Sequence, residues 1–450
     1  MRKRIQQQPS LVEPKIKHEH AAELQQMERL IAAHPEIAHW VHADLIRGLR
    51  DPEAGRKGRM SAEQVFKALL VKQMNGFSYK VLRFHLEDSR SYRAFCGFGF
   101  ADQIPSRSAL QRDIKRIRPE TLEKINRVLL ADAAEKKIEK GRRVRVDCTV
   151  VETNIHHPTD STLLADGVRV LCRLTQAAKG LVNLPVTDHR RRARRRALGI
   201  LNAKQEKVRR KHYRDLLKVA HQVFRNAETV ARALIETPTG DPLAAMAMAA
   251  ELRRYLPLVR RVIDQAERRV LRGEKVPAEE KLFSLFEPHT DVIVKDNRET
   301  HFGHKVTLTG GTSGLILDLV VEKGNPADAT LARGMIQRQE RIYGRAPRQV
   351  AFDGGFASKE NLLDIKQLQV KDVVFHKKRG LKISEMAKSA WVYKRLRNFR
   401  AGIEGMISFL KRCLGLDRCA WSGLESFQAY AWASVVTANL LLIARHLIGG

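Results

Sequence analysis

The order of strand-like and helix-like segments is the feature that most constrains the fold of this chain. Residues 143–150 alternate polar and apolar side chains and are rich in β-branched residues, which is the pattern of a β-strand. Between about residues 186 and 280 the apolar spacing is helical, and strand patterns return only after Pro288. A sheet that starts before a long helical stretch and continues after it implies an α/β domain with a helical insertion.

The second half of the chain supplies the remaining elements of that domain. Segments 304–309 and 315–321 flank a glycine-rich turn and predict a β-hairpin, whose second strand is apolar enough to be central. The patterns that follow predict, in order, helix 328–343, strand 348–353, helix 358–368, strand 372–375 and helix 393–414. Together they predict a mixed five-stranded sheet with helices, an order of elements that resembles a ribonuclease H-like domain.

The residues before the first strand predict short helices separated by Gly or Pro turns, preceded by a flexible polar tail. Basic side chains at exposed helical positions, among them Arg107, Arg112 and Lys115, resemble those of a helix-turn-helix DNA-binding domain. A generic helical bundle with solvated charges explains the same residues equally well. The predicted boundaries are a tail at 1–20, an all-α N-terminal DNA-binding domain at 21–140, a catalytic domain at 141–185 and 286–450, and the basic helical insertion at 186–285.

The net charge of the chain points to its partner. The 450 residues include 82 Lys and Arg against 50 Asp and Glu, which gives +32, yet 43% of the chain is hydrophobic. That hydrophobic content excludes a disordered basic tail protein and implies folded domains with a basic surface. Such a surface favours nucleic acid as the partner, with an anionic membrane or an acidic protein as weaker alternatives.

Much of this charge lies in the helical insertion. Residues 186–227 hold 14 Lys or Arg against 3 Asp or Glu. A face that only needs to be soluble mixes both signs, so this excess favours contact with DNA phosphates over a merely solvated face. The predicted contacts are the arginines of one short run: Arg190, Arg191, Arg192, Arg194, Arg195 and Arg196.

Cysteine usage and hydropathy indicate a cytoplasmic protein. The five cysteines are an odd number without a C-x-x-C pair, so neither a disulfide framework nor a zinc finger is indicated. The N-terminal residues lack the apolar segment of a secretory signal. Residues 426–444 contain no charged side chain and are long enough to span a membrane, but polar residues such as Ser434 and Asn439 favour a buried helix of a soluble core.

Three carboxylates occupy positions where the predicted fold would bring them together. Asp147 lies within the first strand, Asp353 ends a later strand before two glycines, and Glu404 lies on the basic helix near the C-terminus. Three carboxylates with few other ligands suit Mg²⁺ rather than Zn²⁺, and two such ions can promote in-line displacement at phosphorus. Taken singly, each acid has an equally good structural explanation, and only their joint placement favours catalysis.

The surroundings of Glu404 support this interpretation. On a helix, Arg400, Glu404 and Lys411 project within about 40° of one another, so they share one face. One carboxylate and two cations on a face can hold a metal ion and the phosphates beside it. The alternative is an ordinary Arg-to-Glu pair on a solvated helix.

Residues 397–411 resemble the Tyr-x₂-Arg-x₃-Glu-x₆-Lys signature of DDE transposases from bacterial insertion sequences of the four and five superfamily. The match holds at Arg400, Glu404 and Lys411, while Arg397 replaces the tyrosine and Tyr393 lies one turn earlier. Three other segments are similar to further parts of these enzymes: 147–161 to the first catalytic block, 350–356 to the second and 55–98 to the N-terminal helical domain.

The resemblance implies a DNA transposase that cleaves the ends of an insertion sequence and joins them to target DNA. It implies a metal-binding triad of Asp147, Asp353 and Glu404, with Arg400 and Lys411 on DNA phosphates. The implied cofactor is Mg²⁺, as two ions that Mn²⁺ can replace. The implied partners are double-stranded terminal inverted repeats and target DNA, bound by a homodimer in the bacterial cytoplasm at the nucleoid, without a membrane. The alternatives are a non-catalytic DNA-binding protein on the same fold and a ribonuclease H-like nuclease.

Overall fold

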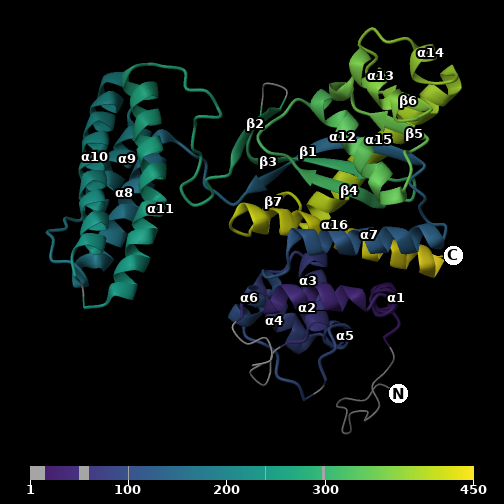
Figure 1. Cartoon of the computed structure of the whole chain (residues 1–450), viewed down its shortest axis with the longest axis horizontal. Helices are drawn as coiled ribbons and strands as arrows, with labels where there is room; N and C mark the ends of the chain where they lie inside the picture. The colour runs from purple at the N-terminus through teal and green to yellow at the C-terminus, as the bar shows by residue number, and fades with distance from the viewer. Residues whose placement is uncertain (1–15, 50–59, 100, 239, 296–298, 450) are drawn as a thin grey trace, which may run out of the picture.

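Figure 1 shows the computed structural model of the chain, in which a helical bundle stands apart from a larger body built around a β-sheet. The first fifteen residues of the predicted tail and the basic segment 55–59 lie outside the described part of the chain. The structure describes residues 16–49, 60–99, 101–238, 240–295 and 299–449.

The body contains one mixed sheet, as the sequence predicts. Its strands are β1 (Arg143–Thr153), β2 (Asp291–Lys295), β3 (Glu299–Gly310), β4 (Ile316–Val321), β5 (Gln349–Phe352), β6 (Asp372–Phe375) and β7 (Arg418–Cys419). Strand β3 is antiparallel to β1, β2 and β4, whereas β5 is parallel to β1 and β6 is parallel to β5. The predicted hairpin is formed by β3 and β4.

The sheet has seven strands where the sequence predicts five, although only five positions lie across it. β2 and β4 pair with different ends of the same edge of β3, and β5 and β7 divide one edge of β1 in the same way. The two additional strands are β2 and β7. The sequence could not indicate β7, because a strand of two residues is too short to show an alternating pattern.

Helices from both ends of the chain pack around the sheet. The helices after β4 are α12 (Asp328–Tyr343), α13 (Lys359–Gln367), α14 (Ile383–Met386), α15 (Ala390–Leu414) and α16 (Leu424–Gly449). α15 packs against β1, β5 and β6, so it crosses the centre of the sheet. α16 packs against β4 on one side and against N-terminal helices on another.

Seven helices precede the first strand within the described residues. They are α1 (Glu19–Ala32), α2 (Glu36–Ile46), α3 (Ala62–Met74), α4 (Tyr79–Asp88), α5 (Arg90–Phe95), α6 (Arg107–Ile114) and α7 (Pro119–Glu135). Serine side chains start α3, α4 and α6 by accepting a backbone N–H in the first turn. These helices share one continuous hydrophobic core with the sheet, because α1, α3 and α7 all pack on α16.

Helix α16 is therefore a core helix. By length and composition alone it could cross a membrane, but 72% of its most apolar window is buried inside the protein. The polar side chain of Asn439 is fully buried and both accepts from the Ile316 N–H and donates to the Ile316 carbonyl oxygen. Those bonds tie α16 to β4 and satisfy the polar group that the sequence showed in this apolar segment.

The bundle has its own core. Its helices are α8 (Asp160–Ala177), α9 (Arg190–Asn202), α10 (Glu206–Glu236) and α11 (Pro242–Ala266). It begins at α8, earlier than the boundary at 186 that the sequence suggested. The apolar side chains of α8, such as Leu164, Val168 and Leu171, belong to the bundle core rather than to the sheet.

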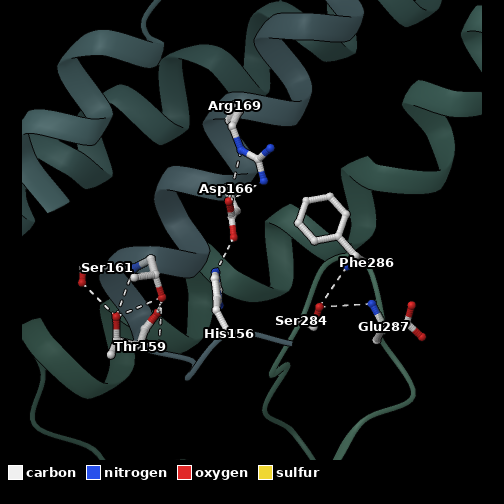
Figure 2. A network of polar contacts seen from close by, with 9 residues as sticks. His156, Thr159, Ser161, Asp166, Arg169, Ser284, Phe286 and Glu287 are labelled. Carbon is white, nitrogen blue, oxygen red and sulfur yellow. Dashed lines mark hydrogen bonds and ion pairs between the residues drawn. The ribbon is translucent and has the colours of Figure 1, made fainter. Parts of the chain in front are cut away.

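A polar network marks the passage from the sheet to the bundle (Figure 2). The His156 ring is 2.9 Å from the Asp166 carboxylate, which also pairs with Arg169 on α8. The Thr159 hydroxyl accepts the Thr162 N–H and so caps the start of α8. On the returning segment, the Ser284 hydroxyl accepts the backbone N–H groups of Phe286 and Glu287. These contacts fix how the chain leaves and re-enters the sheet.

Candidate active site

The two candidate aspartates are neighbours because of strand register. β1 and β5 are parallel and pair Val146 with Phe352, so Asp147 and Asp353 are the next residues along the two strands. Asp147 lies within β1, and its carboxylate accepts the N–H of Cys148 at 2.8 Å. Asp353 follows the last residue of β5, at the carboxyl end of the strand. The register therefore brings together two acids that lie far apart in the sequence.

Glu404 reaches the same place because α15 is fixed against β1. The Arg145 guanidinium of β1 donates to the Phe399 carbonyl oxygen at 2.9 Å and lies 4.6 Å from the centre of the Phe399 ring. Gly402 permits this approach, since a Cβ at that position would lie 2.0 Å from Nη1 of Arg145. Two residues further along the helix, Glu404 contacts the same Arg400 guanidinium as Asp147 and Asp353.

Arg400 joins the three acids. Its Nη2 lies 3.0 Å from the Asp147 carboxylate and 2.9 Å from that of Asp353, and its Nη1 lies 2.7 Å from that of Glu404. The Arg400 side chain is only 11% exposed, whereas that of Glu404 is 65% exposed. The contact between Arg400 and Glu404 is therefore one part of a three-acid cluster and not an isolated pair on a solvated helix.

Burial and neighbouring acids alter the electrostatics of Asp147. Burial raises the pKa of Asp147 to about 6, and the nearby charges of Asp353 and Asp328 raise it as well. The Arg400 guanidinium and the Cys148 N–H oppose this rise. A cation beside a buried carboxyl group favours its charged form, which burial and like charges disfavour.

The three acids are of the chemical type that binds a hard divalent cation. All three acids offer carboxylate oxygens, and in this structure they converge on a positive group, the Arg400 guanidinium. Among the described residues, no three His, Cys, Asp or Glu side chains lie together in a metal-binding arrangement. The carboxylates point at Arg400, so a metal ion bound there would take over a position that the guanidinium now holds.

A cleft of about 620 Å³ opens beside the cluster. Asp147, Glu404 and Lys411 line it, as does Asp417, whose carboxylate lies 3.2 Å from the Lys411 ammonium. Glu404 and Lys411 thus share one face of α15, in the arrangement that their spacing suggests. Tyr393, one turn before the signature, is instead buried, and its hydroxyl donates to the Phe375 carbonyl oxygen.

The arginine run lies on α9, where three of its six side chains pair with two acids. Arg190 pairs with Asp188, and Arg192 and Arg196 both pair with Asp215 of α10. The other three, Arg191, Arg194 and Arg195, are exposed and have no ion pair within the described part of the chain. The sequence run of six basic residues therefore leaves three arginines free for an external anion.

Helix α10 carries a basic stripe that the sequence interpretation did not single out. We call it the α10 stripe: Lys207, Lys211, Arg214, Lys218, Arg225 and Arg232. All six are exposed, and none has an acidic partner among the described residues. Their separations of 4, 7, 11, 18 and 25 residues keep them on one face of the helix over about 37 Å. This spacing was the signal in the sequence that could have revealed the stripe.

The basic residues predicted in the N-terminal helices also lie in different surroundings. Arg112 lies 3.0 Å from its neighbour Asp113. Arg107 and Lys115, in contrast, line a second cavity beside α3 and α4. The acid Asp160, which follows β1, contacts Gln265 and Arg269 and so belongs to the base of the bundle and not to the cluster around Arg400.

Two family models match the chain. The model described as "Transposase DDE domain" matches residues 288–440, and that described as "Transposase domain (DUF772)" matches residues 12–116. Together they cover more than half of the chain. The chain belongs to the DDE transposases of bacterial insertion sequences. No curated protein and no solved structure matches it.

The two matches cover most of the candidate site residues of this transposase but not all of them. The DDE domain match contains Asp353, Arg400, Glu404 and Lys411, which are four of the five residues discussed for the site. Asp147 lies outside both matches, as does the whole bundle from α8 to α11. Membership of the family establishes a DNA transposase of the DDE type, an enzyme that acts on DNA with a divalent metal ion.

Proposed function

We propose that this transposase cleaves DNA strands at the ends of its insertion sequence and joins them to target DNA through Asp147, Asp353 and Glu404. The observation that carries the proposal is the convergence of these three carboxylates on Arg400, from β1, the end of β5 and α15. The strand positions β4, β3, β1, β5 and β6, with the first three antiparallel, support a ribonuclease H-like sheet around them.

Asp147, Asp353 and Glu404 are the residues that would hold Mg²⁺, as two ions, with Mn²⁺ as a substitute. When bound, such ions supply positive charge that activates an attacking oxygen and stabilises the leaving oxygen at phosphorus. The chain itself orients the acids through strand register and through the contact of Arg145 with α15. Arg400, once released from the acids, and Lys411, which lines the cleft, would bind DNA phosphates.

The basic surfaces supply sequence-tolerant binding to DNA phosphates. We assign the N-terminal helices to the double-stranded terminal inverted repeats, and the bundle to flanking or target DNA. In the bundle, the α10 stripe and the unpaired arginines of α9 are the contacts. Cutting two ends together calls for two copies of the chain on the DNA. We place this homodimer in the bacterial cytoplasm, at the nucleoid.

Asp147→Asn tests the assignment, because the amide keeps the shape of the carboxylate but loses its charge. We expect Mg²⁺-dependent cleavage of a DNA duplex carrying the element's terminal repeat to fall by at least about a thousandfold, with DNA binding retained. Asp166→Asn is the matched control, since among the described residues Asp166 pairs only with His156 and Arg169, at the base of the bundle. Cleavage by Asp147→Asn at the parent rate would refute the triad.

The same assay separates the alternatives. A non-catalytic DNA-binding protein would bind the duplex without any cleavage by the parent chain. A ribonuclease H-like nuclease would release hydrolysed ends and join none of them to a second duplex. Covalent products that link the cleaved end to a target plasmid are the outcome that the proposal requires.

A further inference from the structure

A second cavity, of about 530 Å³, lies between the N-terminal helices and the segment after β7. We call it the Lys72 cavity. Its basic lining residues are Lys72, Lys80, Arg107 and Lys115, and no Asp or Glu lines it. Other lining residues include Tyr79, Trp421 and Tyr430, so both aromatic rings and cations line the cavity.

Lys72 is the unusual residue of this cavity. Its side chain is 7% exposed, yet it has no carboxylate partner in the part of the chain that the structure describes. Its ammonium lies 5.2 Å from the centre of the Tyr79 ring, 5.9 Å from Trp421 and 5.8 Å from Tyr430. The faces of aromatic rings partly offset the loss of water around a buried cation, but they do not replace an anion.

Two further donors in the cavity also have no acceptor. The indole N–H of Trp421 and the hydroxyl of Tyr79 are buried without a hydrogen-bond partner among the described residues. Buried donors are nearly always hydrogen-bonded in folded proteins, so these groups point to an acceptor that binds from outside. The first turn of α4, at Ser78 to Lys80, also lines the cavity and adds the positive end of a helix dipole.

We propose that the Lys72 cavity binds a phosphate group of the DNA backbone. A phosphate supplies the negative charge that Lys72 lacks and several acceptor oxygens for the Trp421 and Tyr79 donors. Lys80, Arg107 and Lys115 supply the additional positive charge that an anion needs. The inference rests on the proposed function only in naming DNA as the source of the phosphate.

The position of the cavity favours DNA as that source. Asp417 lines the cleft beside Glu404, and Ala420, three residues later, lines the Lys72 cavity. Three residues of extended chain span about 10 Å, so these two lining residues lie within about 10 Å of each other. A DNA strand whose scissile phosphate lies in the cleft can therefore place another phosphate in the Lys72 cavity.

Lys72→Met in the full chain tests the proposal, because methionine fills similar space without charge. The probe is a fluorescein-labelled DNA duplex of mixed sequence, and binding is followed by fluorescence anisotropy without metal over a range of salt concentrations. We expect several-fold weaker binding, with the slope of log affinity against log salt reduced by about 0.9. Lys124→Met is the matched control, since Lys124 is exposed on α7 and does not line the cavity.

A second variant keeps the test decisive if Lys72→Met fails to fold. Tyr79→Phe retains the aromatic ring and removes only the hydroxyl, so weaker DNA binding by this variant also supports the proposal. Unchanged affinity and salt slope in a folded Lys72→Met chain would overturn it. The proposal would also be overturned if inorganic phosphate at millimolar concentration stabilised the parent but not Lys72→Met while both chains bound DNA equally. The site would then take free phosphate only.

The readout is independent of the triad. Binding is measured without metal and can be repeated in the Asp147→Asn background. If Lys72→Met loses DNA affinity while the parent chain never cleaves DNA, the result supports the cavity and counts against the proposed function. If Lys72→Met cleaves and joins DNA normally and binds it with unchanged affinity, the result supports the proposed function and counts against the cavity.

Discussion

The sheet-centred body and the inserted bundle use charge in different ways. In the body, Arg400 is nearly buried and contacts three carboxylates within 3.0 Å. In the bundle, the α10 stripe is exposed along one helix and has no acidic partner among the described residues. Chemistry at phosphorus requires groups placed to within fractions of an ångström, whereas holding a phosphate backbone requires only positive charge along a line.

The family matches follow the same division. Both models match parts of the body, and neither covers the bundle. The bundle has a separate hydrophobic core, so its surface can change without disturbing the packing of the sheet. We infer that the body determines the reaction and that the bundle adjusts how DNA is held.

The largest expected effect concerns the two basic helices of the bundle. Replacing Lys211, Arg214 and Lys218 by Gln removes three unpaired cations of the α10 stripe, so the salt slope of DNA binding should fall by about 2.7. Affinity at low salt should fall by roughly a hundredfold as a result. Fluorescence anisotropy over a salt series measures both quantities.

The matched variant removes three paired arginines of α9. Replacing Arg190, Arg192 and Arg196 by Gln makes the same change in charge, but these side chains already contact Asp188 and Asp215. We expect the salt slope to fall by less than about 1. Equal flattening by the two triple variants would show that the ion pairs open on DNA, and would remove the distinction between the two helices.

A smaller effect should separate two glycines on α15. Gly402→Ala puts a Cβ against the Arg145 guanidinium, which must then give up its bond to the Phe399 carbonyl, so we expect a loss of about 1–3 kcal/mol of stability and slower cleavage. Gly405→Ala is the control, since nothing lies within 4 Å of its added Cβ and alanine favours a helix by about 1 kcal/mol. Urea unfolding measures both, and equal stabilities would refute the role of Gly402.

Local patterns predicted much of the body. The hairpin of β3 and β4, the strand before Asp353 and the shared face of Arg400 and Glu404 all depend on residues close in sequence. Long-range pairing was harder to predict. The sequence could suggest that Asp147 and Asp353 converge, but only the parallel register of β1 and β5 places them side by side.

The remaining misses have the same physical origin. Asp215 pairs with two arginines of α9 from the neighbouring helix, which no count of charges along the chain could reveal. The Lys72 cavity joins residues near the two ends of the chain, and Lys72 on its own fits an amphipathic helix. Whether a charged side chain is paired depends on its distance in space from an opposite charge. Sequence spacing gives that distance only within one helix or strand.

The smallest expected effect is a pH dependence that only the body should show. Burial lowers the pKa of Lys72 to about 8, with Cys419 opposing the shift and Lys115 adding to it, so the amine loses its proton as the pH rises through that value. DNA affinity should therefore fall several-fold between pH 7 and pH 9, and Lys72→Met should remove that part of the fall.

Stability without DNA should change in the opposite direction. The folded pKa lies below the ordinary value of 10.5, so the unfolded chain binds more protons between these two values and the folded chain gains stability as the pH rises through them. Lys72→Met should lack this gain in urea unfolding at a series of pH values. A parent chain whose stability follows that of Lys72→Met across this range would mean that Lys72 is not buried as a free amine, and the contrast between a buried cation in the body and exposed cations in the bundle would fail at this residue.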